Sequence, residues 1–350
     1  MEKRIQIDGK WIGEGERTYI VAEVSANHLQ NYDRAEAIIR AAAEAGADAV
    51  KLQTYTPDTI TLDCDNDYFQ ITQGTIWDGT TLHKLYEEAY TPWEWQPRLM
   101  EYANGLGLEC FSSPFDATAV DFMKEMDMPA YKVASFEIND IPLIRKIAGL
   151  GKPVILATGI AYLEDMERAL QVCKEEGNEQ VVLLKCTSAY PSPYEEMNLK
   201  VIPNMAQVFD CITGLSDHSM GTAAAVASVA LGAKMVEKHL TLSRADGGPD
   251  GAFSMEPDEF KKMVDEIRIV EKALGKVTYE LSEKQKRSRE DGRSLFVVKN
   301  MKEGEIFTEE NVRSIRPAFG LHTMYLDEIM GKRARTDISK GTPLDWKLIL

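Results

Sequence analysis

One rhythm dominates this chain of 350 residues: a short apolar, β-branched run followed by an amphipathic stretch of helical length. The apolar runs lie at 19–24, 48–54, 108–113, 130–135, 153–158, 181–186, 211–216 and 234–240. Strands that alternate with helices of this length form parallel βαβ units. About eight units in about 280 residues predict a (β/α)8 barrel, also called a TIM barrel.

The stretches between the strands carry helical signals. "YDRAEAIIRAAAEAG" has apolar residues on one face and Gly46 as its C-terminal stop, and "LEDMERALQVCKEEG" ends at Gly177. An open, doubly wound sheet is the alternative arrangement for such units. Sheets of that kind more often have fewer strands, and no GxGxxG sequence follows the first predicted strand. We therefore predict an α/β barrel domain over residues 1–281.

The rhythm ends at the charged segment "SEKQKRSREDGRS", which has almost no apolar residues and indicates a linker. We place this linker at 282–292 and a second domain at 293–350. The second domain has short predicted strands and glycine-containing turns such as "KEGE" and "SKGT". A domain of this size is marginally stable alone, so we expect it to be stabilised by packing against another part of the protein.

Composition restricts the classes of partner. The net charge of -16 argues against nucleic acid, and it means that an anionic substrate requires a local cationic pocket. No apolar run is long enough for a membrane helix, and the polar N-terminus lacks the apolar stretch of a signal peptide. The five cysteines are scattered without a CxxC pair, which indicates reduced thiols and a cytoplasmic protein.

Four predicted strands carry a lysine near their C-terminal ends, at Lys51, Lys132, Lys185 and Lys238. Lysine is rarely buried without a partner, and residues at these strand ends face the active site of a barrel. A group of lysines there would hold phosphate and carboxylate. The alternative is that some lysines point outward and pair with acids, and we expect about half of the four to line the site.

Hydroxyls and carboxylates recur at the same strand ends. The hydroxyl groups, which suit phosphate oxygens, belong to Ser112, Ser113, Ser135, Thr187, Ser188 and Ser216. The acids are Glu23, Glu137 and Glu237. An acid at the end of an apolar strand is either a catalytic group or a partner for one of the lysines.

Two histidines lie at the ends of the last two predicted strands: His218, in "GLSDHSMG", follows the seventh, and His239, in "VEKHLTL", ends the eighth. Neighbouring strands lie about 4.8 Å apart, so both imidazoles can reach one cation. Two histidines with open positions for water and substrate suit a divalent metal that acts as a Lewis acid, whereas structural zinc requires four ligands. A hydrogen-bonding or core role is the alternative. We interpret Cys186 as a buried thiol rather than a nucleophile.

These motifs together resemble the sialic acid synthase family, whose members condense phosphoenolpyruvate with an N-acylated sugar aldehyde. The resemblance covers nearly the whole chain, in family order and spacing. It rests on "AEVSANH", "KLQTYTPD", "FSSPFD", "AYKVASFEIND", "ATG", "KCTSAYPSPYEEMNL", "GLSDHS", "EKHLTL" and "GPDGAFSMEPDEF". The tail, including "RPAFGLH", is similar to the antifreeze-like (SAF) domain of the family.

Within the family, the chain most resembles the branch that forms pseudaminic acid. "QTYTPDTITL", "GTIWDGTTLHKLYEEAYTPWEW" and "SSPFD" are like that branch, whereas the neuraminate branch typically has "KHQTH" and "CTNIYPTPYED". Tyr55 and Ser188 both depart from the neuraminate pattern. The resemblance therefore implies 2,4-diacetamido-2,4,6-trideoxy-L-altrose as the acceptor, with N-acetylneuraminate or legionaminate formation as the alternative.

The resemblance also implies roles for individual residues. Phosphoenolpyruvate would be held by Lys51, Ser113, Lys132, Ser135, Ser188 and Ser216. The sugar would face Gln53, Tyr190, Asp250 and Arg316. His218 and His239 would be catalytic as ligands of Mn²⁺, with Mg²⁺ or Co²⁺ as substitutes, and Glu23 and Glu137 would handle protons and the attacking water. Family members form homodimers in which each SAF domain lies over the partner's barrel.

Two other functions compete with this expectation. A Schiff-base aldolase would also use a lysine at a barrel strand end, but it needs no metal. A non-catalytic sugar-binding protein would be compatible with the C-terminal domain. It would not explain why lysines and histidines cluster at the strand ends. Chelation and phosphate release distinguish these alternatives from a metal-dependent synthase.

Overall fold

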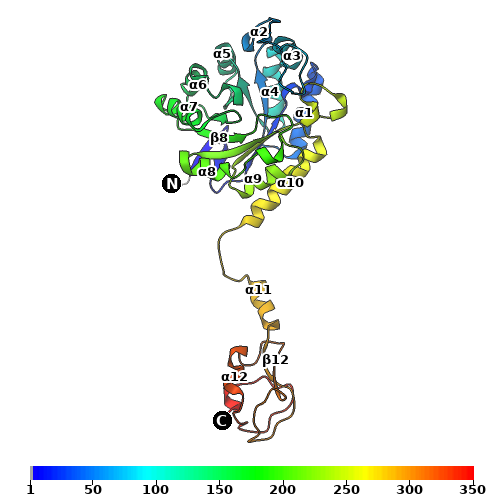
Figure 1. Cartoon of the computed structure of the whole chain (residues 1–350), viewed down its shortest axis with the longest axis vertical. Coiled ribbons are helices and arrows are strands. Elements are labelled where there is room, and N and C mark those ends of the chain that lie inside the picture. Colours follow the sequence, from blue (N-terminus) through cyan, green and yellow to red (C-terminus); the bar gives the residue numbers. More distant parts are fainter. Residues whose placement is uncertain (1–2) are drawn as a thin grey trace. The chain divides into compact units, whose positions relative to one another are not determined.

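Eight parallel strands close into a barrel in the computed structural model, which describes residues 3–350 (Figure 1). The strands follow one another around the barrel in chain order, and the last one pairs with the first. They are β3 (Tyr19–Glu23), β4 (Ala49–Thr54), β5 (Glu109–Pro114), β6 (Tyr131–Val133), β7 (Val154–Ala157), β8 (Val181–Cys186), β9 (Ile212–Asp217) and β10 (Met235–His239). Each strand falls within one residue of a predicted apolar run or inside it. The prediction of a (β/α)8 barrel is confirmed.

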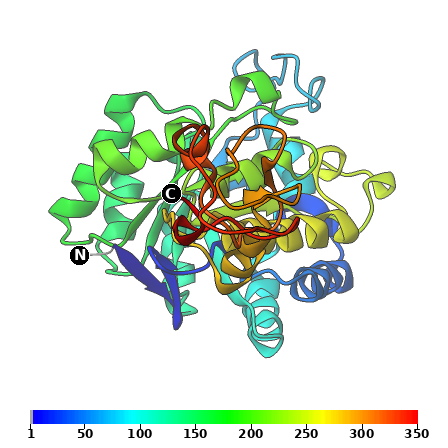
Figure 2. The same cartoon turned by 90° about the horizontal axis from the view of Figure 1, so that it is seen from below.

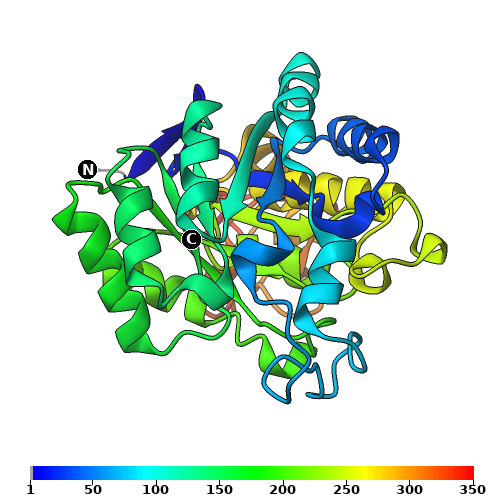
Figure 3. The same ribbon diagram turned by 90° about the horizontal axis from the view of Figure 1, so that it is seen from above.

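Helices surround the strands, as the view in Figure 3 shows. They are α1 (Tyr32–Ala45), α2 (Pro57–Ile60), α3 (Leu82–Ala89), α4 (Gln96–Gly105), α5 (Ala117–Glu125), α6 (Ile141–Ala148), α7 (Leu163–Glu175), α8 (Val201–Phe209), α9 (Ala223–Ala230) and α10 (Pro257–Leu274). Helix α1 begins where the Asn31 side chain accepts a hydrogen bond from the Arg34 amide, and it ends at Gly46, whose φ is 88°. Its buried face packs Ile38 and Ile39 against the strands.

The barrel closes where the last strand pairs with the first. In this ladder Met235 lies opposite Tyr19, and His239 lies opposite Glu23. In the next ladder Glu23 lies opposite Lys51. The register therefore brings an imidazole, a carboxylate and an ammonium group to the same end of three adjacent strands.

A β-hairpin precedes the barrel and was not among the predicted elements. Its strands β1 (Arg4–Ile7) and β2 (Lys10–Gly13) are antiparallel and are dark blue in Figure 2. Asp8 and Gly9 both have positive φ, as the central residues of a type I′ turn require. The sequence signal was therefore the pair Asp8-Gly9 between two short alternating runs. The hairpin buries isoleucines in the same apolar cluster as β3, β8 and β9.

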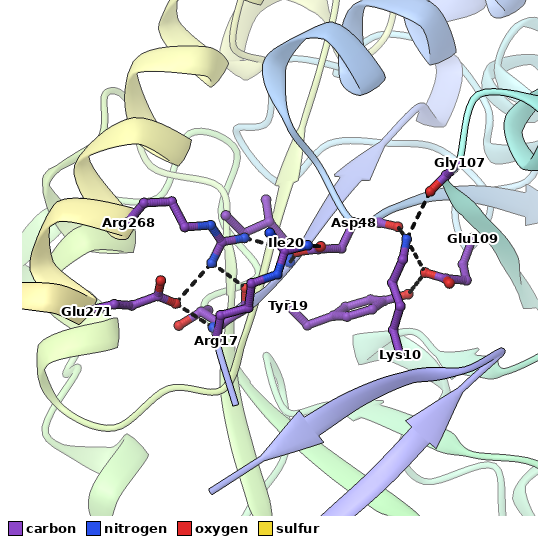
Figure 4. A network of polar contacts seen from close by, with 10 residues as sticks. Lys10, Arg17, Tyr19, Ile20, Asp48, Gly107, Glu109, Arg268 and Glu271 are labelled. Atoms are coloured by element: carbon purple, nitrogen blue, oxygen red, sulfur yellow. Dashed lines mark hydrogen bonds and ion pairs between the residues drawn. The ribbon is translucent and has the colours of Figure 1, made fainter. Parts of the chain in front are cut away.

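A polar network holds the N-terminal ends of the barrel strands together (Figure 4). Asp48, which precedes β4, accepts hydrogen bonds from the Ile20 amide at 3.0 Å and from Arg268 at 3.1 Å, and it also pairs with Arg17. Beside it, Glu109 pairs with Lys10 of the hairpin at 2.7 Å and accepts from the Tyr19 hydroxyl at 3.0 Å. Each of these two acids thus has at least two donors.

The second compact unit comprises residues 276–350 and has a core of its own. It contains α11 (Glu283–Ser288), which lies in the segment predicted as a linker, an antiparallel pair of strands β11 (Ser294–Val297) and β12 (Val312–Ile315), and α12 (Leu326–Ile329). Glycines in the left-handed region occupy the predicted turns at Gly304 and Gly341. Within residues 3–350, no helix combines the length and the apolarity needed to span a bilayer.

Candidate active site

A cavity of about 610 Å³ is lined by residues from the C-terminal ends of the barrel strands and the loops that follow them. The predicted site residues that line it are Lys51, Gln53, Lys132, Ser135, Glu137, Ser188, Tyr190, Ser216, His218, His239 and Asp250. Glu23 and Ser113 do not line it, but both contact Lys51. Arg316 is an exposed residue of the second unit.

Lys51 is the centre of a buried charge cluster. Its ammonium group lies 2.7 Å from Glu23 Oε2 and 3.2 Å from Glu237 Oε1, and it donates to the Ser113 hydroxyl at 3.4 Å. Ser216 in turn donates to Glu237 at 3.0 Å. Because two carboxylates contact this lysine, the pocket is less cationic than the sequence predicted.

The two carboxylates beside Lys51 have opposite acidities. Burial raises the pKa of Glu23 to about 7, because the loss of water outweighs the attraction of Lys51. Burial would raise the pKa of Glu237 as well, but Lys51 and Lys132 together lower it to about 2. Glu237 is therefore the permanent anion of the cluster, and Glu23 is the carboxyl that can exchange a proton near neutral pH.

A small polar cradle lies between the ends of β6, β7 and β8. The Gly159 amide donates to the Ser135 hydroxyl at 3.2 Å, and the buried Ser188 hydroxyl has no hydrogen-bond partner. A Cβ at residue 159 would collide with both serine hydroxyls. Glycine is thus required here for the backbone to approach the serines, and the unpartnered hydroxyl is available to an anionic ligand.

Lys132 and Glu137 face the cavity near this cradle. Lys132 is fully buried, and its ammonium group donates to the Val133 carbonyl oxygen at 3.1 Å. Burial lowers the pKa of Lys132. Burial raises the pKa of Glu137 to about 7, although Lys132 opposes that shift. Glu137 Oε2 is buried without a hydrogen-bond partner, so this carboxyl can accept a proton from, or donate one to, a bound molecule.

The two predicted metal ligands lie beside each other, with ring centroids 5.2 Å apart. His218 Nδ1 faces the Thr187 carbonyl oxygen at 3.2 Å, which selects the tautomer whose Nε2 is a free acceptor. His239 Nδ1 is buried without a partner, and burial keeps the pKa of this imidazole well below its usual value. Burial would lower the pKa of His218 as well, but the neighbouring Cys186 raises it above its usual value. With both rings deprotonated, the two imidazole nitrogens fit a divalent ion that takes its remaining ligands from water and substrate.

No larger ligand cluster surrounds them. Among residues 3–350, no group of three or more His, Cys, Asp or Glu side chains is arranged to hold a metal. Asp250 Oδ2 lies 4.0 Å from His239 Nδ1, beyond bonding distance. The donor set therefore fits an exchangeable catalytic ion better than a structural one.

The remaining polar side chains form a chain of hydrogen bonds along one side of the cavity. Gln53 donates to Glu23 at 3.1 Å and to the Ser25 hydroxyl at 2.9 Å, and Ser25 donates to Asp250. The ring of Tyr190 lies 4.4 Å from the ring of His218. These groups can orient the hydroxyl and amide groups of a ligand whose reacting end lies at the histidines.

Two of the four predicted lysines point away from the cavity. Lys238 pairs with Asp217 at 2.7 Å, and both side chains are fully buried. Lys185 donates to Thr187 at 3.2 Å and does not line the cavity. Cys186 is buried with its sulfur 3.8 Å from His218 Nδ1. Burial would raise the pKa of this thiol, but His218 lowers it to about 7.

Several cavity residues were not predicted. The segment between β4 and α3 supplies Ile71, Gln73, Thr75 and Trp77, and α3 supplies four more side chains. Trp77 donates to the Pro249 carbonyl oxygen at 2.8 Å, and its ring lies 5.3 Å from that of Tyr190. None of these positions follows the strand-end rule. The α3 residues share one helical face, whereas the segment before α3 has no periodic signal.

Known proteins resemble both units. A sequence profile of the NeuB family matches residues 38–279, and one of the SAF domain matches residues 292–350. A pseudaminic acid synthase of Campylobacter jejuni is 48% identical over 94% of this chain and 95% of its own. One of Helicobacter pylori is 43% identical over 93% of this chain and 96% of its own. The crystal structure of an N-acetylneuraminic acid synthetase from Leptospira borgpetersenii has a TM-score of 0.73 at 29% identity, covering 82% of this chain and 95% of that one.

Proposed function

This chain belongs to the NeuB family, and we propose that it acts as a pseudaminic acid synthase. It would condense phosphoenolpyruvate with 2,4-diacetamido-2,4,6-trideoxy-L-altrose and water to give pseudaminic acid and phosphate. One observation carries the proposal: a buried lysine pair, Lys51 and Lys132, shares a cavity with the histidine pair. The relatives at 48% and 43% identity carry this name, whereas the neuraminic acid synthetase structure is 29% identical.

The reaction joins two carbons and breaks one carbon–oxygen bond. The alkene carbon of phosphoenolpyruvate attacks the aldehyde carbon, and the neighbouring carbon becomes an oxocarbenium ion. The aldehyde oxygen becomes a hydroxyl by gaining a proton. Water adds to the cation and loses a proton, which gives a hemiketal phosphate. The carbon–oxygen bond to phosphate then breaks while the added hydroxyl loses its proton and becomes the ketone oxygen, so phosphate leaves with the bridging oxygen. Phosphoenolpyruvate labelled with ¹⁸O at the bridge should give labelled phosphate, and label retained in the keto acid would contradict this mechanism.

The lysine side of the cavity would bind phosphoenolpyruvate. Lys132, the Ser135 and Ser188 hydroxyls and the backbone beside Gly159 would receive its oxyanions, with Lys51 held in place by Glu23 and Glu237. Fixed donors in a buried site stabilise anions without reorganisation during the reaction. This arrangement supports the acceptance of a trianion by a protein of net charge -16.

Proton transfer fits Glu137 better than Glu23. Glu137 lines the cavity, whereas Glu23 does not and is surrounded by Lys51, Gln53 and the Ser25 amide. A base must reach the water that it activates. We assign removal of the water proton to Glu137, and we assign to Glu23 the placement of Lys51.

His218 and His239 would hold the divalent ion, for which Mn²⁺ is the first choice and Mg²⁺ or Co²⁺ the substitutes. When bound, the ion would polarise the aldehyde carbonyl of the sugar as a Lewis acid. Gln53, Tyr190 and Asp250 would orient the rest of the sugar so that its aldehyde faces phosphoenolpyruvate.

A homodimer with exchanged SAF domains is part of the proposal. Large apolar side chains are exposed on the loops that follow β6, β7, β8 and β9 and at the start of α7, namely Phe136, Ile160, Tyr162, Leu163, Tyr194 and Met220. The second unit exposes Phe319, Met324 and Trp346. Apolar surfaces of this kind favour association. In such a dimer Arg316 would contact the sugar in the partner's barrel, and its planar guanidinium suits an acetamido carbonyl.

Complementation tests the role of Arg316 in the dimer. Dimers of Arg316→Ala and of His218→Ala should each be nearly inactive. After dissociation, mixing and reassociation, about a quarter of wild-type activity should return for random pairing with independent sites. No recovery, with heterodimers verified by native mass spectrometry, would mean that Arg316 serves its own barrel or none.

Turnover with three N-acetylated sugars tests the main proposal. Purified protein with Mn²⁺ and phosphoenolpyruvate should release phosphate with the trideoxy altrose, and mass spectrometry should detect the nine-carbon acid. A higher kcat/KM for N-acetylmannosamine or for the legionaminate precursor would refute the assigned substrate. Borohydride trapping of a pyruvate adduct on Lys132 would instead indicate a Schiff-base aldolase.

A further inference from the structure

The cavity has two chemically different halves. Its charged lining residues come from β4, β6, β10 and the loops after β6, β9 and β10. The lining residues between positions 55 and 115 carry no charge. They include the apolar face of helix α3, formed by Leu82, Leu85, Tyr86 and Ala89. We call this uncharged half the α3 wall.

The apolar face of α3 is directed at the cavity. Positions 82, 85, 86 and 89 have the spacing of one helical face, and all four side chains are only half-buried. An amphipathic helix normally buries this face against the core. Here the face borders space that a ligand can fill, so an apolar part of the ligand would complete the packing.

Aromatic side chains frame the α3 wall. Tyr55 contacts Tyr86 at 5.5 Å and Phe115 at 5.1 Å between ring centroids. On the other side, Trp77 is fixed by its hydrogen bond to the Pro249 carbonyl oxygen and lies against Tyr190, which lies against His218. The aromatic contacts run from the metal ligands to the wall, so a sugar that reacts at the histidines extends its far end toward α3.

We propose that the α3 wall is the subsite that selects the methyl group at the far end of the sugar. This inference rests on the proposed function. A methyl group can fill the space beside Leu82 and Leu85, whereas a hydroxyl placed there gives up water without gaining a partner. Discrimination by one group in an apolar pocket is about 10–200-fold in kcat/KM.

The test compares two sugars on one preparation of each variant. Leu85→Ser should lower kcat/KM for the trideoxy altrose about tenfold or more. The value for N-acetylmannosamine should change less than twofold or should rise. The ratio of the two values does not depend on the folded fraction, and Leu82→Ser repeats the test at a second position of the wall. Leu62→Ser is the matched control, because Leu62 is 60% exposed and does not line the cavity.

The outcomes separate this inference from the proposed function. An unchanged ratio in both wall variants, with wild-type protein still using the altrose, would overturn the inference alone. A wild-type preference for N-acetylmannosamine would overturn both. A preference for the stereoisomeric trideoxy precursor of legionaminate would refute the altrose assignment, while a ratio lowered by Leu85→Ser would still support the wall as the methyl subsite.

Discussion

The two ends of the barrel both carry clustered charges, but within the described residues 3–350 the buried polar groups without partners lie away from the N-terminal ends of the strands. At the N-terminal ends of the strands, Asp48 and Glu109 each accept from at least two donors. At the C-terminal ends, Ser188 Oγ and His239 Nδ1 are buried with none. Satisfied charges stabilise a fold, whereas buried groups left unpaired or with displaced pKa values mark a site that a ligand completes.

Metal removal should give the largest loss of activity, and this loss should depend only on residues at the C-terminal ends of the strands. Chelator treatment should abolish turnover, and Mn²⁺ should restore it, because only the C-terminal end carries the paired imidazoles. His218→Ala and His239→Ala should each lower the metal content measured by elemental analysis, and His322→Ala should leave it unchanged. Full activity in protein shown to be metal-free would disprove the assignment.

Removing Lys51 should damage both stability and catalysis. Lys51→Met leaves Glu23 and Glu237 without their shared cation, so we expect a loss of about 3–5 kcal/mol at pH 8 and about a thousandfold fall in kcat/KM. Chemical denaturation and steady-state kinetics measure the two effects. Lys51→Met/Glu23→Gln should recover stability without activity; a double variant with restored activity would contradict a role for Lys51 in substrate binding.

Glu137→Gln should lower kcat by about a hundredfold. Because the pKa of Glu137 in the ligand-free protein is about 7, the wild-type kcat/KM should fall as the pH drops below about 7, and the variant should lose this limb. The folded protein holds the proton more tightly than the unfolded chain does. Stability due to this group is therefore lost as the pH rises from about 4.5 to about 7, and the variant should be more stable than wild type at pH 8.

Glu137→Asp is the control for that prediction, because it retains a carboxyl and should keep a pH-dependent limb. A pH–rate profile of Glu137→Gln that is identical in shape to the wild-type profile would remove Glu137 from proton transfer.

The smallest effect on catalysis should come from the N-terminal end. Asp48→Asn weakens the contacts to Arg17 and Arg268, and it should cost about 1–3 kcal/mol of unfolding free energy. The kcat of the folded protein should stay within twofold of wild type. A large fall in kcat at unchanged stability would show that the two ends are coupled.

Much of the site followed from the rule that strand ends face the active site of a barrel. Lys51, Ser135 and His218 were predicted from that rule and line the cavity. This rule does not say whether Lys238 faces the cavity, but the alternation of side chains along a strand does. If Glu237 and His239 point inward, the residue between them points outward, where Lys238 meets Asp217.

Other features had no such pattern. The segment from 61 to 81 has neither helical nor strand periodicity, so the position of Trp77 over Tyr190 depends on long-range contacts that the sequence does not display. The pKa values near 7 of Glu23 and Glu137 arise from burial, which outweighs the opposing attraction of Lys51 and Lys132. Neither the burial nor those distances can be derived from residue order alone.

Barrel closure has a consequence for how the protein is synthesised. Because β10 pairs with β3, the first barrel strand has no partner on that side until the last strand has emerged from the ribosome. Translation of this interval takes tens of seconds at about 5–20 residues per second. His239 is the final residue of β10 and lies opposite Glu23. A nascent chain therefore lacks the complete site until closure, and a product truncated before β10 can neither close the barrel nor pair its histidines.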